Sequence, residues 1–151
     1  MKPPVNFDTL HAEYAKDTVI DKDNIELELM KIPSLVSKYA DIRSHHKRKS
    51  MALDESYKDM RSKRASYYNG EFCLEDLQKE GWEQYQLSKP KFPSDMKTLL
   101  DNDPILNNIL LKKQLQDGIV NDTEIFIKEL QSRGYNLKAV VDSRRYFAGQ
   151  T

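Results

Sequence analysis

The sequence has few of the residues that turns, covalent cross-links and membrane spans require. Among 151 residues there are five glycines and one cysteine, Cys73. A single cysteine excludes a disulfide framework within the chain and a cysteine-based metal cluster. The low glycine content favours helices over a turn-rich β fold. Because no run of about 20 apolar residues and no signal-peptide pattern occurs, we expect a soluble, intracellular protein.

Motifs that would indicate an enzyme are missing as well. The sequence has no Gly-rich phosphate loop and no Cys, His or carboxylate cluster with metal-ligand spacing. His45 and His46 are adjacent, so on a helix they point in different directions and cannot chelate from one face. We therefore predict no catalytic residue, no metal and no cofactor. A nucleophilic Cys73–His pair is the remaining enzymatic alternative, although a lone cysteine is usually a small hydrophobe.

Apolar residues are scarce for a globular domain. They make up 38% of the chain and charged residues 32%, against about 45–50% and about 25% in typical domains. Long helices that bury their apolar faces against other subunits fit this composition better than a self-sufficient core. The net charge is zero, but residues 5–30 and 71–83 are acidic, whereas residues 38–64 are basic. Such asymmetry marks candidate partner surfaces, although a charge block is usually a solvated helix face.

A first long amphipathic helix is predicted from the spacing between residues 25 and 67. Apolar or aromatic residues recur there every seven positions, with one polar exception, His46. The positions are Ile25, Ile32, Tyr39, His46, Leu53, Met60 and Tyr67. Pro33 either kinks this helix or splits it in two, and Asn69-Gly70 ends it. We interpret His46 as a polar residue tolerated at an interface; a DNA contact is the alternative.

A second helical region begins at Asp103-Pro104, because proline is favoured at the first position of a helix. Arg133-Gly134 is expected to end this helix, and a last short helix is expected from Leu137 to about Phe147. The buried side of the region is predicted to comprise Ile105, Ile109, Leu115, Ile119, Phe126 and Leu130.

The remaining segments complete an all-α prediction. Residues 1–19 are expected to form a loosely held N-terminal arm, and residues 20–151 a single helical domain with a linker near 86–94 and assembly helices within 104–148. Ser94 is expected to cap a short helix over 95–100. Trp82 and Tyr85 are three positions apart, so they could share a helix face, and we expect them to cover the edge of a core.

Basic residues form two clusters in the first long helix. The first contains Arg43, His45, His46, Lys47, Arg48 and Lys49, and the second contains Lys58, Arg61, Lys63 and Arg64, followed by Tyr67 and Tyr68. Rows of cations can follow a phosphate backbone, and neighbouring tyrosines can stack on unpaired bases. These features predict binding of single-stranded DNA. A coiled-coil adaptor that binds only proteins is the alternative, because heptads and a basic face do not require DNA.

Several blocks of the sequence resemble the recombination mediator family of T4-like phages. Arg64, two further residues and then Tyr67-Tyr68-Asn69-Gly70 are similar to the family's basic motif and its Tyr-Tyr-Ser-Gly turn. Met96-Lys97-Thr98 resembles a Met-Lys-Thr block. Further matching positions are Val19-Ile20-Asp21, Ser132-Arg133-Gly134-Tyr135, Asp142, Arg144, Tyr146, Ala148 and Gly149. Together the blocks cover about residues 19 to 150.

The resemblance implies an all-helical protomer that assembles into a closed ring, a hexamer to heptamer. It implies binding of single-stranded DNA and contact with a RecA-like phage recombinase and a phage single-strand-binding protein in the host-cell cytoplasm. The mediator would promote replacement of the second protein by the first. The acidic N-terminal segment and the 71–83 stretch are candidate docking surfaces for these partners.

The resemblance also assigns roles to individual residues. The family's DNA-binding role carries over directly to Arg64. Ser62 stands where the family has a lysine, and we expect Arg61 and Lys63, which flank it, to substitute. Assembly in the family is associated with the C-terminal helices. We extend that role to the apolar side from Ile105 to Leu130 and to Tyr146 and Phe147.

Overall fold

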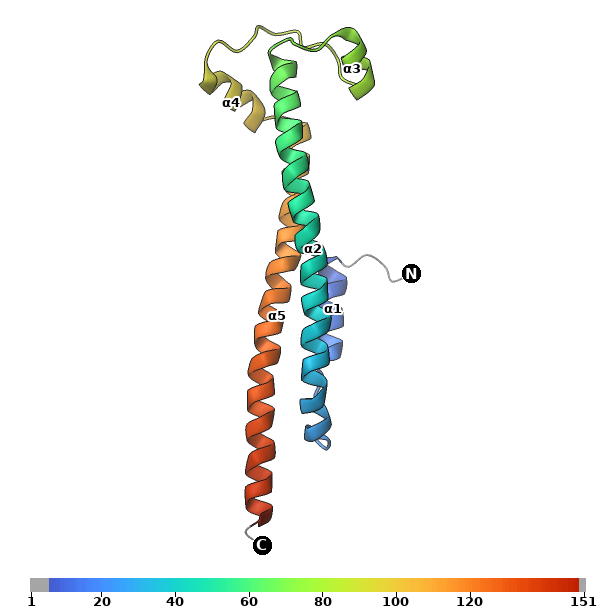
Figure 1. Cartoon of the computed structure of the whole chain (residues 1–151), viewed down its shortest axis with the longest axis vertical. Coiled ribbons are helices and arrows are strands. Elements are labelled where there is room, and N and C mark those ends of the chain that lie inside the picture. Colours follow the sequence, from blue (N-terminus) through green and yellow to red (C-terminus); the bar gives the residue numbers. More distant parts are fainter. Residues whose placement is uncertain (1–5, 150–151) are drawn as a thin grey trace. The chain divides into compact units, whose positions relative to one another are not determined.

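The computed structural model describes residues 6–149, which contain five helices and no strand. The helices are α1 (Phe7–Asp17), α2 (Ile25–Tyr68), α3 (Leu74–Glu80), α4 (Pro93–Asp101) and α5 (Pro104–Gly149) (Figure 1). The all-α prediction is confirmed. The chain divides into two compact units: unit 1 comprises residues 1–48 and 116–151, and unit 2 comprises residues 49–115.

Helix α2 runs without interruption through Pro33, so the proline does not split it. The Pro33 side chain is exposed to solvent, whereas Ile32 beside it is buried. Proline has no amide hydrogen, so the carbonyl one turn earlier in the helix has no backbone donor. Because the proline lies on the solvent side of the helix, water can hydrate that carbonyl. The predicted end is confirmed: α2 stops at Tyr68, and Gly70 adopts the left-handed conformation, with φ of 71°.

Helix α5 is also continuous, so the predicted end at Arg133-Gly134 is wrong. Within residues 6–149, only Gly70 and Gly81 have positive φ. Arg133 instead donates a hydrogen bond of 2.6 Å from Nη1 to the carbonyl oxygen of Thr18, the residue that caps α1. A Cβ on Gly134 would lie 3.3 Å from Cγ2 of Ile32. The glycine therefore permits a close approach of α5 to α2 and does not terminate the helix.

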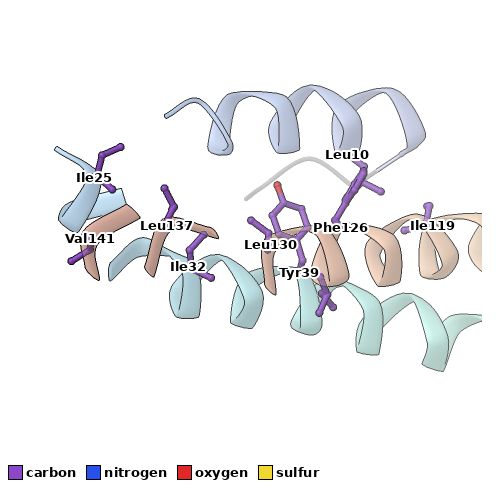
Figure 2. Packing of buried hydrophobic residues seen from close by; sticks show 10 residues of the cluster. Leu10, Ile25, Ile32, Tyr39, Ile119, Phe126, Leu130, Leu137 and Val141 are labelled. Atoms are coloured by element: carbon purple, nitrogen blue, oxygen red, sulfur yellow. The ribbon is translucent and has the colours of Figure 1, made fainter. Parts of the chain in front are cut away.

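The core of unit 1 is formed by one side each of α1, α2 and α5 (Figure 1). Figure 2 shows Leu10 of α1 directed towards Phe126 of α5, beside Tyr39 of α2. Tyr14 stacks on Phe126 with ring centroids 3.8 Å apart, and Tyr39 meets both rings edge-on. The buried cluster comprises Leu10, Ile25, Ile32, Tyr39, Ile119, Phe126, Ile127, Leu130, Leu137 and Val141. Residues 7–17 are thus a packed helix and not the loosely held arm that was expected; residues 1–5 lie outside the described part.

Polar contacts also fix α1 to α2. Nζ of Lys38 lies 2.6 Å from Glu13 and 2.5 Å from Asp17, and the hydroxyl of Tyr39 donates to Asp17 at 2.9 Å. Burial opposes ionisation of Asp17, but the hydrogen bonds from Lys38 and Tyr39 outweigh it and lower its pKa. Two acidic residues of α1, Glu13 and Asp17, therefore hold this helix against α2.

Unit 2 has a smaller core of Tyr68, Leu100 and Leu106. Helix α4 begins at Pro93, so the predicted cap Ser94 lies inside it, and the first turn is closed by the Phe92 amide, which donates to Asp95. The start of α5 at Pro104 is as predicted. Oδ1 of Asp103 caps that helix by accepting hydrogen bonds from the amides two and three positions later, at 2.9 Å and 3.2 Å.

Candidate nucleic-acid interface

The second basic cluster contains a buried cation. The Arg64 side chain is 9% exposed, and its Nε donates to Oδ2 of Asp103 at 2.6 Å. The Asp103 side chain is fully buried. Tyr68 joins the pair by donating from its hydroxyl to the same Oδ2 at 2.7 Å, and Nη2 of Arg64 donates to the Tyr68 hydroxyl at 3.3 Å. Asp103 therefore serves both as the cap of α5 and as the counter-ion of Arg64.

Aromatic rings surround the same guanidinium. Its carbon lies 4.3 Å from the ring centroid of Tyr67, 4.6 Å from that of Trp82 and 5.1 Å from that of Tyr68. Cation–π attraction of this kind contributes about 2 kcal/mol in a desolvated setting. Tyr85 and Phe72 extend the cluster through ring contacts with Tyr68 and Trp82 respectively.

The electrostatics of this network favour the charged pair. Burial disfavours the charge on Arg64, but its bonds to Asp103 and Tyr68 outweigh the desolvation and raise its pKa. Burial likewise opposes ionisation of Asp103, and the hydrogen bonds from Tyr68 and Arg64 lower its pKa despite that. Among residues 6–149, no buried side-chain nitrogen or oxygen lacks a hydrogen-bond partner. Arg64 is therefore held inside unit 2 and is not presented to a phosphate.

The other members of the second cluster lie closer to solvent. Lys58 is exposed and pairs with Asp54 at 3.1 Å and Glu55 at 3.7 Å, while Lys63 pairs with Glu80 at 3.0 Å. Arg61 is half-buried. The cations that form one row in the sequence thus have different environments.

The two tyrosines that follow are engaged within unit 2. Tyr67 is half-buried and donates its hydroxyl to the carbonyl of Glu83 at 2.6 Å. Tyr68 is only 8% exposed. Their rings therefore pack on the buried guanidinium, and the structure does not present both of them as stacking platforms for bases.

The first basic cluster is more open. Arg43 is half-buried, and Lys47, Arg48 and Lys49 are exposed. Within the described part of the chain, no ion pair joins any of these four to a carboxylate. Their charge is therefore available to an external anion.

His46 belongs to the interior of unit 1. It is 3% exposed, and its Nδ1 lies 2.6 Å from Oε1 of Gln116 on α5. This position agrees with a polar residue at a helix interface. A DNA contact, which was the alternative, would need an exposed ring.

The residues expected to mediate assembly fall into three groups by burial. Ile119, Phe126 and Leu130 are at most 6% exposed within the core of unit 1, so they cannot contact another copy in this arrangement. The sequence pattern could not separate burial within a subunit from burial between subunits. Ile105 and Ile109 are half-buried in unit 2. The exposed members are Leu115 at 49%, Tyr146 at 65% and Phe147 at 64%.

Some features of the site had only a faint sequence signal. Asp103 was recognisable as a helix cap, but its second role depends on a contact with Arg64 across 39 positions. Tyr85 packs against the core of unit 2, as expected, whereas Trp82 stacks on Phe72 and meets the Tyr67 ring edge-on. Trp82 and Tyr85 both lie beyond Gly81, which ends α3 in the left-handed conformation, so the two aromatics do not share a helix face.

The described residues include the cysteine Cys73 and two long helices, α2 and α5. Cys73 is exposed, and its thiol donates a hydrogen bond of 3.1 Å to Oδ2 of Asp76. Residues 6–149 contain no group of three or more His, Cys, Asp or Glu side chains placed to hold a metal ion. No helix among them is long and apolar enough to cross a bilayer.

Comparison with known proteins gives one consistent family. A family model described as "Recombination, repair and ssDNA binding protein UvsY" matches residues 13–150. The recombination protein UvsY of Enterobacteria phage T4 is 23% identical over 146 residues, which cover 97% of this chain and 100% of that protein.

Solved structures share the fold. A crystal structure of the bacteriophage T4 recombination mediator protein UvsY superposes with a TM-score of 0.76 at 23% identity, covering 96% of this chain and 99% of the other. A second lattice of the same protein gives a TM-score of 0.75 at 20% identity, with 94% and 98% covered. The fold is therefore common to both chains.

Proposed function

This chain belongs to the UvsY family of recombination, repair and single-stranded-DNA-binding proteins, and from that premise we propose that it is a recombination mediator. It binds single-stranded DNA and promotes loading of a RecA-type recombinase in place of single-strand-binding protein. The observation that carries the proposal is the family match over residues 13–150. The unpaired cations of α2 support it.

In this proposal the phosphates are contacted by surface cations of α2. Arg43 and Lys47 are four positions apart, so they lie on one side of the helix. With Arg48 and Lys49 they carry charge that no carboxylate among residues 6–149 neutralises through an ion pair.

The second basic cluster has a divided role. Arg61 adds charge at the surface of unit 2, whereas Lys58 and Lys63 contribute where phosphates displace the carboxylates with which they pair. Arg64 contributes indirectly, because its guanidinium holds the surrounding aromatic rings together.

The mediator breaks no bond in this scheme; it works by differential binding. A protein shifts an equilibrium only by its difference in affinity for the two states. Here the two states are DNA that carries single-strand-binding protein and DNA that carries the recombinase. The acidic faces of α1 and of residues 71–83 are the proposed docking surfaces, because complementary charge steers and orients partners.

We propose that the protomers form a ring, and exposed apolar residues of unit 1 support this. Tyr146 and Phe147 near the end of α5 are exposed, as are Leu27 and Met30 near the start of α2. A shallow hollow of about 520 Å³ is lined by the start of α2 and the end of α5, with Leu27 and Met30 in its lining. Large apolar side chains that remain exposed in a subunit are candidates for burial between copies. A ring would repeat the α2 cations once per subunit and turn weak contacts into avidity.

The proposal is tested by fluorescence anisotropy of a labelled single-stranded oligonucleotide, titrated with protein at several salt concentrations beside a duplex. We expect preference for the single strand and strong salt dependence. The double variant Arg43→Ala/Lys47→Ala should bind more weakly and reduce the salt slope by about 0.7 for each phosphate that is no longer neutralised. Lys128→Ala/Lys138→Ala removes the same charge from exposed sites on α5 and serves as the matched control.

A second assay addresses the mediator role. Assembly of a RecA-type recombinase on DNA precoated with single-strand-binding protein should be faster with the wild type than without it, and the Arg43→Ala/Lys47→Ala variant should lose this effect. If the wild type binds no single-stranded DNA even at low salt, the proposal fails, and an adaptor that binds only proteins becomes the better interpretation.

A further inference from the structure

The segment between α3 and α4 combines cations and an aromatic ring at the surface. Its sequence is Lys89-Pro90-Lys91-Phe92-Pro93. Both lysines are exposed, and within residues 6–149 neither forms an ion pair with a carboxylate. In contrast, Lys58 and Lys63 of the same unit form ion pairs with carboxylates of the same chain. This segment therefore carries positive charge that no carboxylate among residues 6–149 neutralises through an ion pair.

Phe92 is exposed although its backbone is fixed. Its side chain is 65% exposed. Its amide donates to Asp95 at 3.3 Å, and its carbonyl accepts from the amides of Asp95 at 3.1 Å and Met96 at 3.3 Å. The residue is thus held at the start of α4 while its ring faces solvent. Leu87, earlier in the segment, is 71% exposed as well.

The two prolines limit the conformations of this segment. Each fixes its own φ near −65° and restricts the residue before it, which affects Lys89 and Phe92. A segment that is already ordered loses less entropy when it binds a ligand. The lysines and the ring are therefore presented to a partner at a low entropic cost.

The fold brings this segment to the end of α2. The side chain of Lys89 lies over Gly70, so that a Cβ on the glycine would be 3.2 Å from Cε and 3.9 Å from Nζ of the lysine. Lys89 and Lys91 also line a shallow hollow of about 520 Å³ together with Thr98 of α4. Asp95 is the acidic residue in that lining.

We propose that residues 87–93 form a second contact for single-stranded DNA, in which Phe92 stacks on an unpaired base and Lys89 and Lys91 bind the flanking phosphates. Exposed aromatic rings beside cations are the elements that sequence-independent single-strand binding uses. A duplex offers no unstacked base to the ring, so the contact favours single strands. The inference rests on the proposed function, because it adds a site to the same DNA-binding activity.

The test measures oligothymidylate binding by anisotropy for the full-length protein. Phe92→Ala should weaken binding by about 5- to 140-fold, since a stacked base contributes about 1–3 kcal/mol, and should leave the salt slope unchanged. Phe92→Trp, which keeps an aromatic face, should bind as the wild type does. Lys89→Ala/Lys91→Ala should lower the salt slope by about 1.4, at about 0.7 for each single-strand phosphate.

Matched controls separate the site from general effects. Leu74→Ala removes an apolar side chain that is 69% exposed on α3, and Lys79→Ala/Lys112→Ala removes two exposed lysines of unit 2. Light scattering at one protein concentration checks that each variant keeps the assembly state of the wild type. Fluorescence of Trp82, the single tryptophan, checks that the aromatic cluster is intact in every variant except Phe92→Trp.

Each outcome has a distinct meaning. Binding by Phe92→Ala equal to that of Leu74→Ala would overturn the inference while leaving the proposed function in place, and the segment would then be a protein-docking surface. Absence of single-strand binding by the wild type would overturn both. Loss of binding by Phe92→Ala with rescue by Phe92→Trp supports the second contact.

Discussion

Arg64 is held by one carboxylate and three aromatic rings, so its removal would leave Asp103 buried without a counter-charge. Breaking a buried pair by deleting one partner costs about 3–5 kcal/mol, because the remaining charge is neither paired nor hydrated. The motif that the sequence offers as a DNA contact thus has a structural function in this chain. A loss of DNA binding on mutation of Arg64 would not by itself identify a phosphate contact.

The Arg64–Asp103 pair gives a prediction at the residue scale. Arg64→Met, which keeps the stem of the side chain, should lower the free energy of unfolding by about 3–5 kcal/mol. Asp103→Asn should also destabilise the protein, although it keeps an oxygen that can cap α5. The double variant should be less destabilised than the sum of the two single variants. Urea unfolding at one fixed protein concentration measures all four proteins.

The pH dependence provides a check on this prediction. The pKa of Asp103 is lowered on folding, so its contribution to stability is present above its unfolded pKa of about 3.9 and is lost as the pH falls through the folded value. An asparagine at this position cannot titrate, so Asp103→Asn should show a shallower loss of stability below about pH 4. Additive destabilisation in the double variant, or an unchanged acid profile in Asp103→Asn, would contradict the assigned pairing.

At the scale of single helices, tertiary packing decides whether a proline or a glycine ends the helix that contains it. Pro33 lies in α2 with its ring exposed, and α2 continues because Ile25, Ile32 and Tyr39 are buried against the rest of unit 1. Gly134 lies in α5, where its lack of a side chain accommodates Ile32. In both cases tertiary contacts outweigh a local preference of about 1 to 3 kcal/mol.

The stability of a Pro33→Ala variant can be predicted at the scale of the helix. Proline in a helix interior costs about 3 kcal/mol relative to alanine, and its stiffness in the unfolded chain offsets about 0.4–1 kcal/mol of that. Pro33→Ala should therefore stabilise the protein by about 2 kcal/mol and raise the Tm by roughly 4–8 °C. Differential scanning calorimetry measures the shift, with the neighbouring exposed Ser34→Ala as the control, for which about 0.5 kcal/mol is expected.

A lower Tm for Pro33→Ala would have a different meaning. It would show that a bend at the proline is needed to place Ile32 and Tyr39 in the core of unit 1. Ser34→Ala should then remain close to the wild type, because its side chain is exposed and the change does not affect the bend.

At the scale of the whole molecule, the exposed apolar residues give a prediction about assembly. Tyr135, Tyr146 and Phe147 on α5 are 76%, 65% and 64% exposed. Tyr146→Ser/Phe147→Ser should reduce the mass of the assembly measured by light scattering, because the variant lacks apolar surface that would be buried between copies. The helical content should stay unchanged by circular dichroism, since both side chains lie outside the core of unit 1.

The matched control for assembly is Leu74→Ser, which removes a side chain that is 69% exposed on α3. It should keep the mass of the wild type. A wild-type protein that is monomeric at all concentrations, or a double variant with unchanged mass, would contradict the proposed interface. In the second case the exposed Leu115 would become the next position to test.

The amino-acid sequence by itself determined the helical class and much of the register. A seven-residue apolar repeat, a proline at the start of α5 and an Asn-Gly end of α2 are local signals, and each is satisfied in the structure. These features depend on backbone preferences and on which side of a helix is apolar, and both can be evaluated within a few turns of chain.

Only the tertiary structure decided the environment of each charge. Arg64 and Lys47 are both cations on α2, yet one is buried against Asp103 and the other is exposed. Arg133-Gly134 has the sequence of a helix end, but Thr18 and Ile32 lie against it and the helix continues. The physical reason is the same in each case: desolvation and pairing depend on residues far away in the chain, and helical spacing contains no information about them.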